Sequence, residues 1–216
     1  QQTIMLDLGA NVEVSEEHLL QFAVMGAIFA KYISKIDDPR IGLLNIGEEA
    51  QKGRLNVRKA AALIEGAPIP GHYIGFVEGN DISAGTVDVI VTDGFPGNIA
   101  LKTVEGTAEF ISGLFSSSVK DADLLSKLRL WVARPVLRRM RRLADPRHYN
   151  GAMFLGLNGV CVKSHGGMDP VGFSNAIKTA YELAKNDFIT HVKQDLPAAI
   201  ASVNSDTDPS DVAAQS

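Results

Sequence analysis

Residues 87–106 read VDVIVTDGFPGNIALKTVEG, and this stretch decides the fold. Its apolar run at 87–91, interrupted by one aspartate, is typical of a buried strand in a parallel sheet. The run ends at Thr92-Asp93-Gly94, and Phe95-Pro96-Gly97-Asn98 is predicted to turn the chain. Residues 99–115 then carry apolar side chains at three- to four-residue spacing, which predicts a helix. The stretch therefore predicts a strand–turn–helix unit of an α/β fold.

This turn predicts a binding site for an anion. In open α/β sheets, ligands bind at the carboxyl ends of the strands, where Asp93 and Gly94 lie. A helix that begins beside Gly97 and Asn98 offers free N–H groups and the positive end of its dipole to phosphate or carboxylate. Lys102, one turn into the helix, adds a positive charge. The same residues also fit an ordinary connection with an asparagine cap and a solvated lysine.

The composition is that of a globular protein. The 216 residues carry a net charge of −4, which argues against a general nucleic-acid binder. Cys161 is the only cysteine, so we expect neither an internal disulfide nor a thiolate metal cluster. No apolar run reaches the length of about 18 residues that a membrane span needs. Because the chain starts inside an apparent strand without a methionine, we expect a fragment of a cytoplasmic protein.

Three further predicted strands also end in polar residues. These strands and the residues near their ends are 3–8 with Asp7 and Asn11, 40–46 with Asn45 and Glu48, and 73–77 with Glu78 and Asp81. Helical patterns over 18–36 and 54–65 separate the strands. Because parallel strands share a direction, we expect these polar side chains along one edge of the sheet, as parts of a substrate-binding site.

The adjacent carboxylates Glu48 and Glu49 have two interpretations. They suit a general acid–base pair or metal ligands. They equally suit the acidic first turn of a helix, where carboxylates favour the helix dipole.

Residues 119–149 form a basic segment. It holds nine Lys or Arg and three Asp, and apolar side chains interleave with the basic ones. Pro135 is predicted to split it into two short amphipathic helices. We expect a protruding arm that docks on an acidic partner or an anionic membrane surface. The candidate docking residues are Arg129, Trp131, Arg134, Arg138, Arg139, Arg141 and Arg142. An arm whose apolar face packs on a second subunit is the alternative.

Residues 150–165, NGAMFLGLNGVCVKSH, predict a hairpin of two short strands around a favoured Asn-Gly turn. The second strand brings Lys163, His165 and Gly166 to its end. His165, beside two glycines, is a candidate anion contact. Cys161 lies between two valines and is expected in the core.

The predicted domain organisation is simple. We expect one α/β domain over residues 1–198, with the arm at 119–149 inserted in it. The last helix begins at Asp169-Pro170 and runs to about residue 196. Residues 199–216, rich in Ser and Asp toward the end, are expected to be a disordered tail.

Four blocks together resemble a known family. They are LDLGAN at 6–11, LLNIGEE at 43–49, TDGFPGNIALKTVEG at 92–106 and YNGAMFLGLNGVCVKSHGG at 149–167. In this order they resemble the PlsX-type phosphate acyltransferases of bacterial phospholipid synthesis, over residues 3–188. The resemblance implies an isopropylmalate-dehydrogenase-like fold, with three layers α/β/α around a mostly parallel sheet, and a homodimer. Members of this family are longer at the N-terminus.

The resemblance also implies a reaction, in which acyl-[acyl carrier protein] and orthophosphate give acyl phosphate and the free carrier. Helix N-termini, Lys102 and His165 then suit the phosphate, and the Asn98 amide suits the developing oxyanion. No enzyme nucleophile, metal or cofactor is required. The arm then docks the acidic carrier or anionic head groups at the inner face of the membrane.

Three other functions remain open from the sequence. A phosphotransacetylase of the same fold would act on acyl-coenzyme A and would not need the basic arm. An oxidoreductase of the isopropylmalate dehydrogenase type would use Mg²⁺ and a nicotinamide cofactor, for which Asp93 with Asp7 or Glu48 gives thin support. A carrier- or membrane-binding fragment would bind without turnover.

Overall fold

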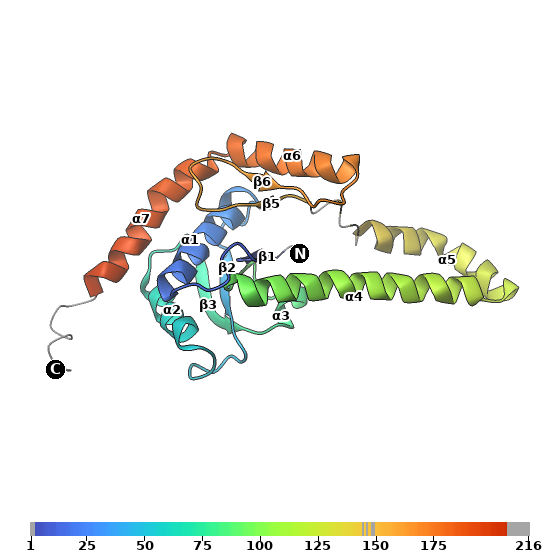
Figure 1. Ribbon diagram of the computed structural model, residues 1–216, viewed down its shortest axis with the longest axis horizontal. Helices are drawn as coiled ribbons and strands as arrows, with labels where there is room; N and C mark the ends of the chain where they lie inside the picture. The colour runs from blue at the N-terminus through green and yellow to red at the C-terminus, as the bar shows by residue number, and fades with distance from the viewer. Residues whose placement is uncertain (1–2, 144, 146, 148–149, 207–216) are drawn as a thin grey trace. The chain divides into compact units, whose positions relative to one another are not determined.

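The computed structural model describes residues 3–143, 145, 147 and 150–206, without the side chains at 127–128, 140–143 and 203–206 (Figure 1). The helices and strands follow the chain in the order β1 (Ile4–Leu6), α1 (Glu16–Tyr32), β2 (Arg40–Leu44), α2 (Leu55–Gly66), β3 (His72–Val77), α3 (Asp81–Ala84), β4 (Val89–Val91), α4 (Gly94–Asp121), α5 (Leu124–Leu143), β5 (Ala152–Met153), β6 (Val162–Lys163), α6 (Pro170–Lys185) and α7 (Phe188–Asp206).

The chain divides into two compact units. The sheet unit comprises Gln1–Ala100, Phe154–Cys161 and Tyr181–Ser216, and the arm unit comprises Leu101–Met153 and Val162–Ala180. The sequence predicted one domain with an arm at 119–149. In the structure the second unit also takes in the last three-quarters of α4 and the first part of α6.

The sheet unit is built on a parallel sheet with the strand order β1-β4-β2-β3. Leu6 of β1 pairs with Val91 of β4, which pairs in turn with Leu43 of β2. All three strands therefore end at the same edge, because their pairing is parallel. The predicted α/β class with a mostly parallel sheet is confirmed.

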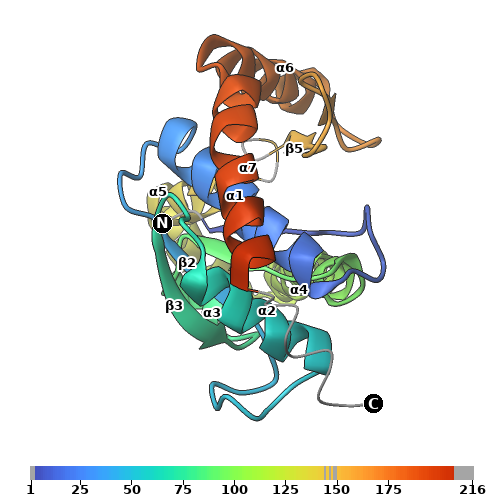
Figure 2. The ribbon, with the colours of Figure 1, turned by 90° about the vertical axis from the view of Figure 1, so that its left-hand side faces the viewer.

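One face of the sheet is covered by α1, whose residues from Leu19 to Ala30 are nearly all buried. The fit is close at Gly26, where a Cβ atom would come within 2.6 Å of Val89 and 2.9 Å of Leu6. Figure 2 shows α7 running alongside α1. Phe29 and Phe188 join the two helices edge to face at 6.0 Å between ring centroids. A run that is apolar nearly all round thus becomes a helix packed on two sides.

The opposite face of the sheet has its own small core. Ile90 and Val77 are buried there with Val87, and Met5 and Ile82 pack against them. Val89 and Ile90 are neighbours along β4 and point to opposite faces, since side chains alternate along a strand. Both faces of β4 are therefore buried, which explains its continuous apolar run.

Asp88, the aspartate inside that apolar run, is paired with Arg40 of the neighbouring strand. Asp88 is 4% exposed and accepts hydrogen bonds from the backbone N–H and the Nε of Arg40, at 2.9 and 3.0 Å. This charge-assisted pair links β2 to the start of β4. The hydrogen bond to Asp88 raises the pKa of Arg40.

Several element boundaries differ from the predictions. The helix expected at 99–115 begins at Gly94 and extends to Asp121. Pro135 does not split the basic segment, because α5 runs through it as one helix. The proline leaves one carbonyl without its helical N–H partner, and in this exposed helix water can take its place.

The C-terminal helix is also different. It is two helices, α6 and α7, and the break lies at Asp187, whose φ of +49° is incompatible with a continuous helix. Helix α7 extends to Asp206, so residues 199–206 are helical, while residues 207–216 of the expected tail lie outside the described residues. None of the described helices is both long enough and apolar enough to span a membrane.

Candidate functional site

The loop after β1 is organised by a single carboxylate. Asp7 is 8% exposed. Its Oδ1 accepts the backbone N–H groups of Gly9 and Ala10 at 2.8 and 2.9 Å. Its Oδ2 accepts the backbone N–H and the side-chain Nδ2 of Asn11 at 2.7 and 2.8 Å. Burial raises the pKa of Asp7, but these hydrogen bonds outweigh it and hold the pKa below its usual value. The carboxylate therefore fixes the shape of the loop at residues 8–11.

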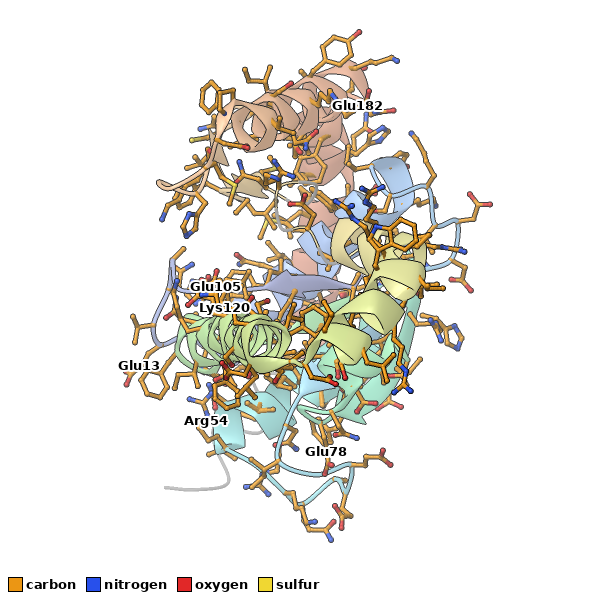
Figure 3. The ribbon with its side chains drawn as sticks, turned by 90° about the vertical axis from the view of Figure 1, so that its right-hand side faces the viewer. Glu13, Arg54, Glu78, Glu105, Lys120 and Glu182 are labelled. Carbon is orange, nitrogen blue, oxygen red and sulfur yellow. The ribbon has the colours of Figure 1, made fainter. Side chains whose placement is uncertain are left out.

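A second buried carboxylate follows β4. Asp93 is 1% exposed, forms an ion pair with the guanidinium of Arg54, and accepts the Phe95 N–H at 3.2 Å through Oδ1. It is thus the N-cap of α4. Arg54 lies just before α2 and is half exposed, so its outer face is accessible to solvent (Figure 3).

The loop at 7–11 packs directly against the first turn of α4. The Gly94 N–H donates to the Asn11 carbonyl at 2.8 Å, and the Asn98 Nδ2 donates to the Leu8 carbonyl at 3.0 Å. A Cβ on Gly94 would lie 2.5 Å from the Asn11 carbonyl oxygen, and one on Gly97 would lie 1.9 Å from that of Asp7. Two glycines therefore permit the helix to begin against this loop.

This contact changes the prediction for the helix N-terminus. The helix begins at Gly94, so Gly97 and Asn98 lie inside its first turns. The Gly94 and Phe95 N–H groups donate to Asn11 and Asp93, Pro96 has no N–H, and Gly97 donates to the Asp93 carbonyl at 3.1 Å. The free N–H groups expected beside Gly97 and Asn98 are therefore not there. The physical reason is that Asp93 and the loop carbonyls already satisfy the helix start.

The parallel pairing brings the polar residues that follow β1, β2 and β4 to one edge of the sheet, and their role in substrate binding stays a prediction. The ends of β1 and β4 lie together: the Asp7 N–H donates to the Thr92 carbonyl and the Thr92 N–H donates to the Leu6 carbonyl, both at 2.8 Å. The Asn45 Nδ2 donates to the Lys52 carbonyl at 3.0 Å. Glu48 is exposed, and Glu49 pairs with Lys52 at 2.8 Å. Because α2 begins only at Leu55, these two glutamates are not the first turn of a helix.

The arm unit holds His165 and the two strands of the predicted hairpin, whereas residues 154–161 between those strands belong to the sheet unit. Strands β5 and β6 pair antiparallel, as expected. The imidazole of His165 is exposed, and its Nδ1 accepts the Gly167 N–H at 3.2 Å. Lys163 and Gly166 are exposed too, and a Cβ on Gly166 would meet nothing within 4 Å. Cys161, expected in the core, is exposed, because strands of two residues form no layer that can bury it.

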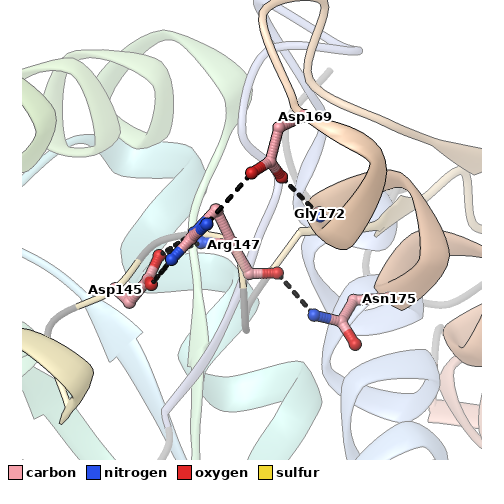
Figure 4. A network of polar contacts seen from close by, with 5 residues as sticks. All are labelled: Asp145, Arg147, Asp169, Gly172 and Asn175. Atoms are coloured by element: carbon pink, nitrogen blue, oxygen red, sulfur yellow. Dashed lines mark hydrogen bonds and ion pairs between the residues drawn. The ribbon is translucent and has the colours of Figure 1, made fainter.

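Arg147 organises the junction before this hairpin (Figure 4). It donates to both oxygens of Asp145 and, through Nη1, to Asp169 at 3.0 Å. Asp169 also accepts the Gly172 N–H at 3.0 Å, as the cap of α6. The hydrogen bond from the Gly172 N–H, and to a smaller extent the one from Arg147, lowers the pKa of Asp169. Asn175 donates to the Arg147 carbonyl at 2.7 Å, so the junction is tied to α6 from both sides of Arg147.

The rest of the arm unit is highly exposed. Lys102 pairs with Glu105 at 2.7 Å, and Trp131 is 66% exposed. The side chains of Arg129, Arg134, Arg138 and Arg139 are exposed as well, whereas those of Arg141 and Arg142 lie outside the described residues. The part of α4 that lies in this unit also exposes large apolar side chains, which are Val104, Phe110, Ile111, Leu114 and Phe115.

Three residues that shape these sites were not identified from the sequence. Arg54 was interpreted only as a helix start, and Asn150 and Arg147 were given no role. Arg54 and Asp93 are 39 residues apart, so no local pattern signals their pairing. Within the described residues no group of three or more His, Cys, Asp or Glu side chains is arranged to hold a metal ion.

Comparison with known proteins identifies the family. The sequence matches the family model described as "Fatty acid synthesis protein" over residues 1–191. It is 52% identical over 199 residues to a phosphate acyltransferase of Rhodospirillum centenum, covering 90% of this chain and 55% of the relative. It is 46% identical over 195 residues to a phosphate acyltransferase of Rhodospirillum rubrum, covering 90% and 56%. The chain thus spans about half the length of the curated relatives it matches. These matches confirm the resemblance seen in the four sequence blocks, and the chain belongs to the fatty acid synthesis protein family.

Proposed function

We propose that this chain forms part of a phosphate acyltransferase, which transfers an acyl group from acyl-[acyl carrier protein] to orthophosphate. The observation that carries the proposal is the identity of about half the residues, over 90% of this chain, to relatives that bear this name. We assign to it the isopropylmalate-dehydrogenase-like fold that the sequence resembles. The protein works in the cytoplasm, at the inner face of the membrane.

The chemistry needs little from the protein beyond positioning and charge stabilisation. An oxygen of orthophosphate attacks the thioester carbonyl carbon, the C–O bond forms, and the C–S bond breaks. The leaving thiolate takes the proton that the attacking hydrogen phosphate gives up, and it is released as the free carrier thiol. Because a thiol has a pKa of about 8.5, strong acid catalysis is not required. Holding phosphate in line with the carbonyl is the larger contribution.

His165 is assigned to orthophosphate. Its Nδ1 accepts the Gly167 N–H, so the neutral imidazole carries its proton on Nε2. That N–H is a donor for a phosphate oxygen. The turn at Gly166 leaves open space around the backbone, which lets an anion approach closely. Lys163 and Lys102 supply positive charge, and phosphate competes with Glu105 for Lys102.

The Asn98 amide is assigned to the developing oxyanion. One of its two Nδ2 hydrogens is held by the Leu8 carbonyl, which orients the other. The loop at 7–11 and the first turn of α4 position this amide. The residues that do so are Asp7, Asn11, Asp93, Gly94 and Gly97. Asn45 and Glu48 stay assigned to the substrate-binding edge of the sheet.

The helices of the arm unit are assigned to two macromolecular contacts. The apolar side chains exposed on α4 include Phe110 and Leu114, which are one turn apart and pack against a second copy in a homodimer. Sedimentation equilibrium tests this assignment, and a monomer at all concentrations refutes it. The basic side chains of α5 face the acidic carrier protein and anionic lipid.

Release of free thiol from acyl-[acyl carrier protein] tests the enzyme. We expect release that depends on orthophosphate, and a loss of about a hundredfold in His165→Ala with a higher KM for phosphate. The assay uses this chain and a version extended at its N-terminus by the corresponding segment of the Rhodospirillum centenum relative. His72→Ala, on an exposed residue of β3, is the matched control and keeps full activity.

The outcomes separate the candidate functions. Release only from the extended version means that the additional segment carries indispensable contacts. Preference for acyl-coenzyme A over the carrier thioester favours the phosphotransacetylase. If neither version releases thiol but both still bind the carrier, the result favours a carrier-binding fragment without turnover. Unchanged turnover and phosphate KM in His165→Ala refute the role of His165.

Flotation with anionic phospholipid vesicles tests the membrane contact. Trp131 is exposed on α5, and a Trp beside arginines suits the boundary between head groups and acyl chains. We expect the chain to float with the vesicles and Trp131→Glu to remain in the soluble fraction. Ala133→Glu makes the same charge change on a different side of the helix, so it retains binding. Equal flotation of Trp131→Glu and the unsubstituted chain contradicts the proposed contact.

A further inference from the structure

Asn150 joins three parts of the arm unit. It is 8% exposed, and its side chain lies between the end of β6 and the first turn of α6. Its Oδ1 accepts the His165 N–H at 2.9 Å. Its Nδ2 donates to the Ser164 Oγ at 2.9 Å and to the Gly172 carbonyl at 2.8 Å. The carboxamide therefore uses its acceptor on the backbone of His165 and both of its donors on the neighbouring structure.

The backbone beside Asn150 is held in place as well. Gly151 has a φ of +123°, which disfavours any side chain. A Cβ at this position would lie 3.0 Å from the Ala176 Cα and 3.1 Å from the Thr179 Oγ1, so the chain lies close against α6. The cap at Asp169 fixes the start of that helix. Asn150 is thus anchored to a rigid element on one side and holds the His165 backbone on the other.

The imidazole of His165 depends on this backbone. Among the described residues, the hydrogen-bond partner of the ring is the Gly167 N–H, two residues further along the same turn. The Met168 N–H donates to the His165 carbonyl at 3.2 Å, which closes the turn. The turn joins α6 through Met168 and Asp169, and the bond from Asn150 fixes its other end at His165. Without this bond we expect the turn to persist and its His165 end to shift.

We propose that Asn150 is a positioning residue for His165, which it holds where the imidazole binds orthophosphate. The proposal rests on the function proposed above, in which His165 is the phosphate ligand. A displacement of about 1 Å is enough to cost up to a hundredfold in rate or binding at such a site. A buried carboxamide with three satisfied bonds supplies the required rigidity, because each unmade bond would leave a buried polar group unpaired.

The test follows the imidazole resonances of His165 by NMR during a titration of the chain with inorganic phosphate at pH 7 and constant ionic strength. We expect phosphate to shift these resonances, and Asn150→Ala to weaken the apparent affinity about tenfold or more. Asn175→Ala is the matched control. It removes the same side chain from α6, where the amide holds Arg147 instead of His165, and it leaves the affinity within about twofold of the original.

A double-substitution cycle separates positioning from general loss of structure. In the His165→Ala background, phosphate is followed through the Gly166 and Gly167 amides. Removing Asn150 there has no further effect if it acts through His165. If Asn150→Ala fails to fold, Asn150→Asp replaces it. The carboxylate still accepts the His165 N–H and a hydrogen bond from Ser164, but it repels the Gly172 carbonyl, so the affinity falls by less than in His165→Ala.

Different results refute the positioning role of Asn150 and the phosphate-binding role of His165. A His165 that responds to phosphate equally with and without Asn150 overturns the positioning role and leaves the proposed function intact. Equal losses on removing Asn150 in both backgrounds also overturn it, because they indicate a structural effect. A His165 that does not respond to phosphate in the unsubstituted chain refutes its role as ligand, and the role of Asn150 falls with it.

Discussion

Replacement of Gly97 by alanine is expected to destabilise the sheet unit severely. The added Cβ would lie 1.9 Å from the carbonyl oxygen of Asp7 and 3.0 Å from the Thr92 side chain. The first contact is with backbone that is paired across β1 and β4, so it cannot move without breaking the sheet edge. We expect a loss of more than about 4 kcal/mol, which is a large share of the roughly 5–15 kcal/mol of stability of an ordinary domain. Urea unfolding followed by circular dichroism measures it.

The control is Gly66→Ala in the same unit. Gly66 is exposed at the end of α2, and a Cβ there meets nothing within 4 Å. Alanine should be neutral or stabilise by up to about 1 kcal/mol, because it restricts the unfolded chain and favours the helix. A folded Gly97→Ala protein that has lost only phosphate-dependent turnover would contradict the packing argument. It would support the sequence-based view of Gly97 as a substrate-binding position.

The stretch around Gly97 shows what the sequence predicts well. The apolar run of β4 and the polar residues after each strand predicted a parallel sheet with one polar edge. This prediction depends only on the direction shared by the strands, which a crossover connection enforces. The pairing of Leu6, Val91 and Leu43 confirms it. The Asp-Leu-Gly-Ala-Asn loop was likewise placed correctly, because its bonds to Asp7 are all local.

The start of α4 shows why the rest was harder. Phe95-Pro96-Gly97-Asn98 has the composition of a turn, and it was interpreted as one. Proline is tolerated in the first turn of a helix, and Asp93 immediately before is a good N-cap, so a signal for the true start was present. The need for glycine at position 97, however, comes from the Asp7 carbonyl, which lies 90 residues earlier in the chain. No local pattern contains that contact.

Residues 147–172 show the same limit. Asn150 and Arg147 act on residues 14 to 28 positions further along the chain, through single hydrogen bonds that no periodicity reveals. The exposure of Cys161 also follows from the tertiary arrangement. Between two valines the residue has the pattern of a core strand, but strands β5 and β6 of two residues each give it no covering layer.

Replacement of Asp7 by asparagine is expected to destabilise the sheet unit by about 2–4 kcal/mol at pH 7. The carboxylate accepts four hydrogen bonds from the loop at 8–11, two through each oxygen. In asparagine an NH₂ group replaces one of the two oxygens. This donor group then faces the N–H groups of either Gly9 and Ala10 or Asn11, and donor repels donor. The loop carbonyls that hold the start of α4 then lose their fixed position. Urea unfolding of both proteins gives the difference.

The pH dependence of that difference identifies its cause. The pKa of Asp7 is lowered in the folded protein, so its ionised form stabilises the fold above the unfolded-state value of about 3.9. This contribution is lost as the pH falls through the lower, folded-state pKa. The stability gap between the original chain and Asp7→Asn should therefore be widest at neutral pH and narrow progressively below about pH 4. Asp38→Asn, on an exposed residue of the same unit, should show little gap at neutral pH. A gap for Asp7→Asn that stays constant down to pH 2 would show that side-chain packing, and not the ionised carboxylate, holds the loop against α4.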